Sequence, residues 1–144
     1  MRSARWEKLL SVRILIVDDS GSFREHICKM LAKLPNFQVI CEVSDGLEAV
    51  HKAEQLQPDV ILLDIGLPKL NGIAAGRQIR KISPESKIIF VSQESSVEVV
   101  QEAFNLGARA YVQKSQIATD LQAAIDTVLE GGQFVSNGLI PDVP

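Results

Sequence analysis

The sequence predicts an α/β fold in which helices cover both faces of a parallel sheet. Five short runs rich in Val and Ile alternate with segments whose apolar residues have helical spacing. The runs are apolar throughout, which is typical of strands buried on both faces. Five such units in 144 residues fit one domain. Because crossovers are right-handed, we expect a flavodoxin-like (βα)5 doubly wound sheet of five parallel strands in the order 2-1-3-4-5.

The five expected strands each end where apolar residues give way to polar ones. They are, in chain order, VRILIVDD at 12–19, FQVICEV at 37–43, DVILLDI at 59–65, KIIFVSQ at 87–93 and ARAYVQK at 108–114. Their length and their content of branched residues favour strands over helices.

Each run is followed by an apolar stripe with the three- and four-residue spacing of a helix. The stripes are Phe23, Ile27, Leu31 and Leu34; Leu47, Val50, Ala53 and Leu56; Ala75, Ile79 and Ile82; Val100, Ala103 and Phe104; and Leu121, Ala124, Ile125 and Val128. Proline follows the first three stripes and glycine the last two, and both residues commonly end helices.

The composition argues against several classes of protein. A net charge of −3 gives no support to a broad basic surface for nucleic acid. No apolar run is long enough to cross a bilayer, and the first residues lack the features of a signal peptide. Cys28 and Cys41 have no metal-ligand spacing. We expect a cytoplasmic protein with an N-terminal extension at 1–11, one domain at 12–132 and a tail or linker start at 133–144.

Polar side chains follow four of the five apolar runs directly. Asp18 and Asp19 end the first run, Asp64 the third, Ser92 the fourth and Lys114 the fifth. In an open parallel sheet, ligands bind outside the carboxyl ends of the strands. We therefore expect these side chains on one edge, with the three carboxylates in the crevice between the first and third strands.

Three carboxylates without a thiolate make a hard oxygen site, which favours Mg²⁺. Such an ion offsets the repulsion between Asp18 and Asp19, about 4 kcal/mol at about 4 Å and an effective dielectric of about 20. Lys114 and Ser92 suit the oxygens of a phosphoryl group, and Asp64 between them is the expected nucleophile. Taken alone, Asp18, Asp19 and Ser20 could instead cap the following helix and favour its dipole.

Together these residues make the chain similar to the receiver domain of two-component response regulators. The matching features are the aspartate pair, the D-x-x-x-P-x-x-x-G pattern of Asp64, Pro68 and Gly72, and the strand-end residues Ser92 and Lys114. The resemblance covers residues 12–132. It implies that Asp64 accepts a phosphoryl group from the phosphohistidine of a sensor histidine kinase.

The resemblance also implies roles for the neighbouring groups. Asp19 and Asp64 would ligate Mg²⁺ together with the backbone carbonyl of Gly66, and Asp18 would hold the metal mostly through water. Lys114 would pair with the phosphoryl oxygens.

The implied switch involves two further side chains. Ser92 would move inward to hydrogen-bond the phosphoryl group, and Tyr111 would follow it inward. The face built from the fourth helix, the fifth strand and the fifth helix would then change, which shifts the equilibrium between two states.

The segment LEGGQFVS at 129–136 looks like the receivers of regulators that carry a LuxR-type helix-turn-helix. This likeness implies transcriptional output through a DNA-binding domain that the sequence does not contain, although a single-domain receiver stays open. Homodimer formation on phosphorylation is a further implication, and no membrane partner is expected. Such a domain is no enzyme in the ordinary sense, although it catalyses its own phosphorylation and dephosphorylation.

Three alternatives stay open at this point. A phosphatase of the haloacid dehalogenase type needs a second carboxylate two residues after the nucleophile, where this chain has Gly66. A flavodoxin would place Asp18 and Asp19 beside the flavin phosphate, which is electrostatically poor. A receiver fold could also dock partners independently of phosphorylation.

Two positions differ from many receivers and bear on the phosphorylated state. Gly66 offers no side chain to position an attacking water, and the long side chain of Gln93 replaces a small residue beside Ser92. We expect slow hydrolysis of the phosphorylated form.

Overall fold

Twelve elements form in the part of the chain that the computed structural model describes, residues 11–139. The strands are β1 (Val12–Val17), β2 (Phe37–Val43), β3 (Val60–Leu63), β4 (Lys87–Ser92), β5 (Ala110–Gln113) and β6 (Phe134–Val135). The helices are α2 (Gly21–Ala32), α3 (Gly46–Leu56), α4 (Gly72–Ile82), α5 (Val97–Asn105), α6 (Ile117–Leu129) and the 3₁₀ turn η1 (Lys114–Gln116).

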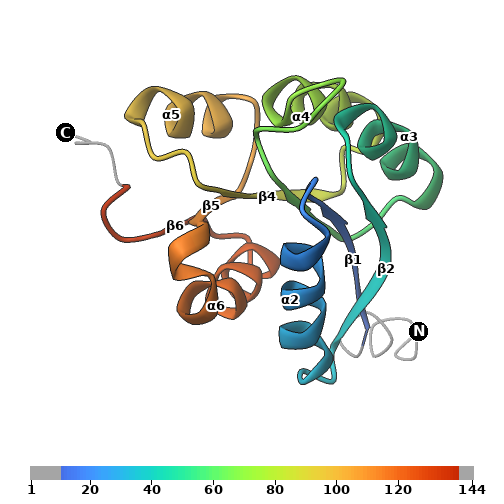
Figure 1. Cartoon of the computed structure of the whole chain (residues 1–144), viewed down its shortest axis with the longest axis vertical. Coiled ribbons are helices and arrows are strands. Elements are labelled where there is room, and N and C mark those ends of the chain that lie inside the picture. The colour runs from blue at the N-terminus through green and yellow to red at the C-terminus, as the bar shows by residue number, and fades with distance from the viewer. Residues whose placement is uncertain (1–10, 140–144) are drawn as a thin grey trace.

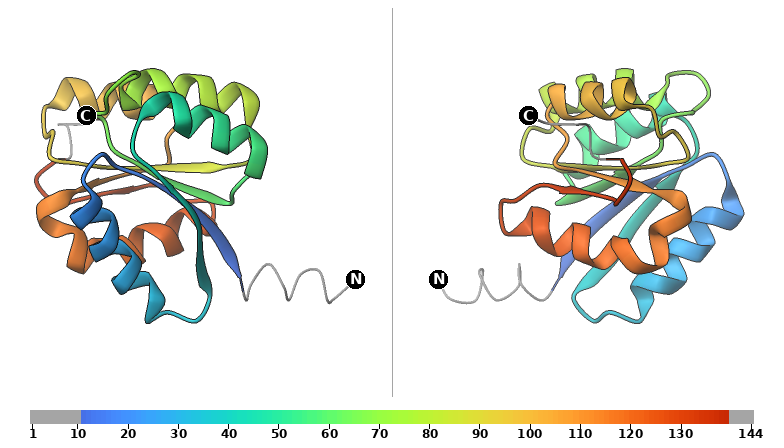
Figure 2. Two further views of the ribbon diagram at one scale, coloured as in Figure 1. Left: turned by 45° about the vertical axis from the view of Figure 1, so that its right-hand side comes forward. Right: turned by 90° about the vertical axis from the view of Figure 1, so that its left-hand side faces the viewer.

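The strands form one parallel sheet between two layers of helices (Figures 1 and 2). The strand order is β2-β1-β3-β4-β5-β6. The flavodoxin-like doubly wound fold and the order 2-1-3-4-5 are therefore confirmed, with one strand added beyond the fifth. The central strand β3 is buried along its whole length, whereas the edge strand β2 is partly exposed.

Two apolar cores lie on opposite faces of the sheet. One contains Ile27 and Leu31 of α2 with Leu121, Ile125 and other residues of α6. The other contains side chains of α3, α4 and α5, and Figure 1 shows these three helices together on the second face. This arrangement places the loops after β1, β3 and β5 at one end of the sheet.

The buried face of α3 differs from the expected stripe. Ala49 and Ala53 are fully buried, whereas Leu47 is 54% exposed. The first turn of α3 lies directly against the loop before α4, because a Cβ on Gly46 would meet the carbonyl oxygen of Leu70 at 1.8 Å. A side chain at residue 46 would collide with that loop, and Ala49 and Ala53 lie in the core that α3 shares with α4.

The sheet continues past the expected domain end at residue 132. β6 pairs in parallel with β5, and Ser136 secures it: its hydroxyl donates to Asp120 (2.6 Å) and accepts from the Gln113 amide (3.1 Å). Most of the expected N-terminal extension, residues 1–10, and the end of the expected tail, 140–144, lie outside the described residues. Within 11–139, no helix has the length and apolar character needed to cross a membrane.

Candidate functional site

Three aspartates meet where β1 and β3 end. Asp18 and Asp19 follow β1 directly, Asp64 follows β3, and one carboxylate oxygen from each lies within 4.8 Å of the others. Asp18 is 2% exposed and Asp64 7%, whereas Asp19 is exposed. The expected crevice between the first and third strands is thus where the structure brings these side chains together.

Backbone hydrogen bonds hold the two buried aspartates in place. The amide of Asp18 donates to the carbonyl of Val43 (3.1 Å), and that of Asp64 donates to Val17 (3.0 Å), so both residues continue the sheet ladder. Asp64 Oδ1 accepts from the Ile65 amide (2.7 Å). These bonds do not use Asp64 Oδ2, which contacts Lys114 in the crevice.

Asp18 also takes part in starting the next helix. Its Oδ1 accepts from the Ser20 amide at 2.8 Å, and the Ser20 hydroxyl caps α2 by accepting from the Phe23 amide. Ser20 is therefore the cap of α2, and Asp18 supports it through Oδ1 while its Oδ2 contacts Lys114.

Lys114 supplies the positive charge of the site. Its Nζ lies 2.8 Å from Asp18 Oδ2 and 3.1 Å from Asp64 Oδ2. The ring of Phe23 lies below the ammonium, 4.5 Å from Nζ to the centroid, which favours the charged form. In the sequence, Phe23 is recognisable only as a member of an apolar stripe, so its contact with Lys114 could not be predicted.

Burial and pairing act in opposite directions on the charged groups. Burial raises the pKa of Asp18, and the hydrogen bond from Lys114 only partly opposes that shift. Burial also lowers the pKa of Lys114, but its hydrogen bonds to Asp18 and Asp64 outweigh this effect, so the net pKa is raised. The ammonium is thus held protonated between two carboxylates, and three carboxylates cluster around this one lysine.

Arg24 is a second residue that the sequence did not mark. Its Nη1 donates to the backbone oxygen of Asp18 at 2.6 Å, while Nε pairs with Glu42 at 3.1 Å. This bond ties the first turn of α2 to the end of β1. Arg24 therefore positions the backbone on which Asp18 and Asp19 stand.

Gly72 allows the loop that follows Asp64 to fold back on the end of β3. The amide of Gly72 donates to the Ile65 carbonyl at 2.7 Å, which folds the loop back on the end of β3. A Cβ at Gly72 would lie 1.9 Å from the carbonyl oxygen of Asp64. Residue 72 therefore needs to be glycine for the loop to close beside the carboxylate.

Ser92 and Tyr111 lie close together but are bonded to the loop after β4. Ser92 is buried, and its hydroxyl accepts from the Glu94 amide at 3.1 Å. Tyr111 is fully buried, and its hydroxyl donates to the Glu94 carbonyl at 2.9 Å. The loop at Glu94 is therefore the structural link between these two residues.

The buried Tyr111 gives a direct spectroscopic prediction, because it is the single tyrosine of the chain. Burial raises its pKa to about 12, so phenolate absorbance should appear near that pH in the folded protein and near pH 10 after unfolding. Between these values only the folded state keeps the proton, so the free energy of unfolding should fall as the pH rises. A midpoint near 10 with unchanged circular dichroism would contradict the buried position.

The donor set fits a hard divalent cation. Carboxylate oxygens are the ligands that Mg²⁺ prefers, and an exposed carboxylate such as Asp19 leaves room for the waters that the ion retains. Gly66 is exposed two residues after Asp64 and has no heavy atom within 4 Å of a Cβ built on it.

A doubly wound parallel sheet with an acidic crevice at the carboxyl ends of β1 and β3, and a lysine beside it, places the chain in the class of flavodoxin-like α/β domains with a charged site at the topological switch point. Comparison with known proteins identifies the family. The model of the response regulator receiver domain matches residues 14–126. The chain belongs to this family, and the phosphatase and flavodoxin alternatives no longer apply.

Individual relatives agree with this assignment. The transcriptional regulatory protein DegU of Brevibacillus brevis is 36% identical over 124 residues, which cover 86% of this chain and 52% of that protein. The chemotaxis protein CheY of Thermotoga maritima is 38% identical over 102 residues, covering 71% of this chain and 84% of CheY. The chain spans about half the length of several curated relatives that it matches, including DegU.

Solved structures give the same result for the fold. A LuxR-family two-component response regulator from Aurantimonas sp. SI85-9A1 superposes with a TM-score of 0.85 at 30% identity. The match covers 90% of this chain and 92% of that one.

Proposed function

We propose that Asp64 is the phosphoacceptor of this receiver domain and that phosphoryl transfer requires Mg²⁺. The observation that carries the proposal is the cluster of three carboxylates with one ammonium bonded to two of them. Such a cluster suits an incoming group that is itself anionic and arrives with a divalent cation.

In the proposed reaction, a carboxylate oxygen of Asp64 attacks phosphorus and forms an acyl phosphate. The bond from phosphorus to the imidazole nitrogen of a phosphohistidine breaks at the same time, and the imidazole leaves with its electron pair. Lys114 contacts Asp64 Oδ2 before the reaction. After transfer, Lys114 would contact a phosphoryl oxygen instead. Asp19, Asp64 and the carbonyl of Gly66 would ligate Mg²⁺, with Asp18 holding it mostly through water, and the ion would supply charge neutralisation when bound.

The proposed switch starts from the bonds at Glu94. The Ser92 hydroxyl would exchange its bond with the Glu94 amide for one to the phosphoryl group, which would move the loop after β4. Tyr111 would respond because its hydroxyl is bonded to the Glu94 carbonyl in the same loop. The surface formed by α5, β5 and α6 would change as a result, and a partner that prefers one state would bind more tightly.

The wider role follows from the family. The phosphoryl donor would be a sensor histidine kinase in the cytoplasm, and phosphorylation would favour a homodimer. Residues 12–132 would form the receiver proper, and the chain after β6 would lead toward a DNA-binding output domain that controls transcription. DNA would be contacted only through that domain.

Incubation with acetyl phosphate tests the metal requirement. We expect intact mass spectrometry to show one added phosphoryl group with Mg²⁺ and none when EDTA replaces the metal, because the carboxylates repel the anionic donor without it. The Lys29→Met variant, which removes an exposed lysine on α2, should behave as wild type. Labelling that is equal with and without the metal would contradict the proposed role of Mg²⁺.

We expect residue 66 to influence how fast the phosphoryl group on Asp64 is hydrolysed. Gly66→Asn adds an amide that can orient water toward the phosphorus, and the open space around Gly66 accommodates it. We expect hydrolysis about tenfold faster, within the range of one positioned polar group. Gly66→Ala separates the amide effect from loss of glycine and should hydrolyse like wild type; equal or slower loss in Gly66→Asn would refute the idea.

A further inference from the structure

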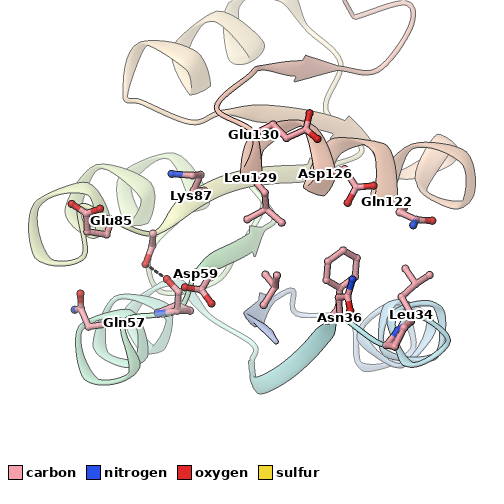
Figure 3. A pocket seen from close by; sticks show the side chains of 15 residues that line it. Leu34, Asn36, Gln57, Asp59, Glu85, Lys87, Gln122, Asp126, Leu129 and Glu130 are labelled. Atoms are coloured by element: carbon pink, nitrogen blue, oxygen red, sulfur yellow. Dashed lines mark hydrogen bonds between the residues drawn. The ribbon is translucent and has the colours of Figure 1, made fainter. Parts of the chain in front are cut away.

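A cavity of about 700 Å³ lies at the end of the sheet opposite to Asp64 (Figure 3). Its lining includes Val12, Phe37 and Lys87, the first residues of β1, β2 and β4. All strands are parallel, so their amino ends lie away from the acidic crevice. The volume is within the range of ordinary binding sites, roughly 300–1,000 Å³, and the receiver chemistry does not use it.

The cavity has an apolar part with an exposed leucine. Leu129, at the end of α6, is 39% exposed and points into the cavity (Figure 3). Leu34 and Phe37 also line it. An exposed leucine that faces other apolar side chains forms a surface on which a further apolar group can bind.

The cavity is also acidic. Asp59, Glu85, Asp126 and Glu130 line it, and Lys87 is the one basic residue in the lining. An occupant that combines an apolar or aromatic group with positive charge would therefore match it.

The segment before β1 has this composition. Residues 1–10, MRSARWEKLL, contain one tryptophan, two leucines and three basic residues against one glutamate. They lie outside the described residues, but the chain that follows them enters the fold at Val12, which itself lines the cavity. The five residue-to-residue steps from Trp6 to Ser11 can span roughly 17 Å, far enough to reach the cavity from its rim.

We propose that residues 1–10 dock in this cavity of their own chain, with Trp6 against Leu129 and with Arg5 and Lys8 facing the acidic lining. The tether gives the segment an effective concentration on the order of 1 mM, so a weak intrinsic affinity suffices. The occupant is thus a part of this chain, and the cavity that it enters lies at the end of the sheet opposite to Asp64.

Trp6 is the single tryptophan of the chain, so its fluorescence reports on the segment alone. In the full chain we expect blue-shifted emission and an acrylamide quenching constant roughly half that of a synthetic peptide of residues 1–11. Leu129→Glu, which places a charge in the apolar part, should give the emission and quenching of the free peptide. Leu47→Glu is the matched control, because it changes a leucine on α3 that is 54% exposed and outside the cavity.

Asp126→Lys provides a second variant that does not depend on the leucine. It reverses one charge of the lining and should also release Trp6, as should high salt, because ions screen such pairs. Circular dichroism confirms that each variant is folded. Peptide-like emission in the wild type, or unchanged emission in folded Leu129→Glu and Asp126→Lys, would overturn the proposal. A blue shift that grows with protein concentration would do so too, since the segment would then occupy a second copy.

Discussion

Replacing Gly72 with alanine should abolish most phosphorylation and destabilise the domain by about 3 kcal/mol. The new Cβ would lie 1.9 Å from the carbonyl oxygen of Asp64 and 2.7 Å from Cα of Ile65, so backbone must move rather than a flexible side chain. A displacement of about 1 Å at a reacting group can lower a rate by about a hundredfold. Urea unfolding gives the stability, and the rate of labelling by acetyl phosphate gives the effect on the site.

Gly66→Ala is the matched control in the same loop. No heavy atom lies within 4 Å of a Cβ at Gly66, and its φ is not positive. We expect its stability to stay within about 0.5 kcal/mol of wild type. Equal effects of the two alanines would mean that the loop tolerates movement and that Gly72 has another role.

Replacing Lys114 with methionine should have the second large effect. The ammonium is bonded to both Asp18 and Asp64, so its loss leaves two buried carboxylates without a shared cation. We expect a loss of roughly 1–3 kcal/mol in unfolding free energy without metal. Labelling by acetyl phosphate should slow by about a hundredfold, because one charged group that stabilises the developing phosphoryl charge is gone.

Added Mg²⁺ distinguishes a lost charge from lost packing. If the missing charge causes the instability, saturating Mg²⁺ should restore part of the unfolding free energy of Lys114→Met. The exposed pair of Lys29 with Glu25, 3.9 Å apart, is the control, and Lys29→Met should change stability by less than about 0.5 kcal/mol. A stability of Lys114→Met equal to wild type would show that the ammonium is not needed to balance the carboxylates.

The sequence predicted the arrangement of the site because parallel strands end at a common edge. Each of Asp18, Asp64 and Lys114 follows an apolar run directly, so finding the strand ends was enough to bring these residues together. Right-handed connections left few topologies for this alternation, and the flavodoxin-like order was the best choice among them. These inferences needed only local pattern and general topology.

Contacts between distant elements could not be predicted in the same way. Phe23 beneath Lys114 and Arg24 on the Asp18 carbonyl depend on how α2 packs against the ends of β1 and β5. β6 has only two residues, too few to give a periodic pattern. Leu47 was assigned to the buried face of α3 by its helical spacing, but the structure places Ala49 and Ala53 in the core and leaves Leu47 exposed.

The central claim is that Asp64 carries the phosphoryl group, and borohydride reduction tests it most directly. Protein labelled by acetyl phosphate with Mg²⁺ is reduced, which converts an aspartyl phosphate to homoserine, and the peptides are sequenced by mass spectrometry. We expect homoserine at position 64 in the wild type and no labelling in Asp64→Asn. Homoserine at Asp18 or Asp19 with Asp64 unmodified, or undiminished labelling of Asp64→Asn, would contradict the account.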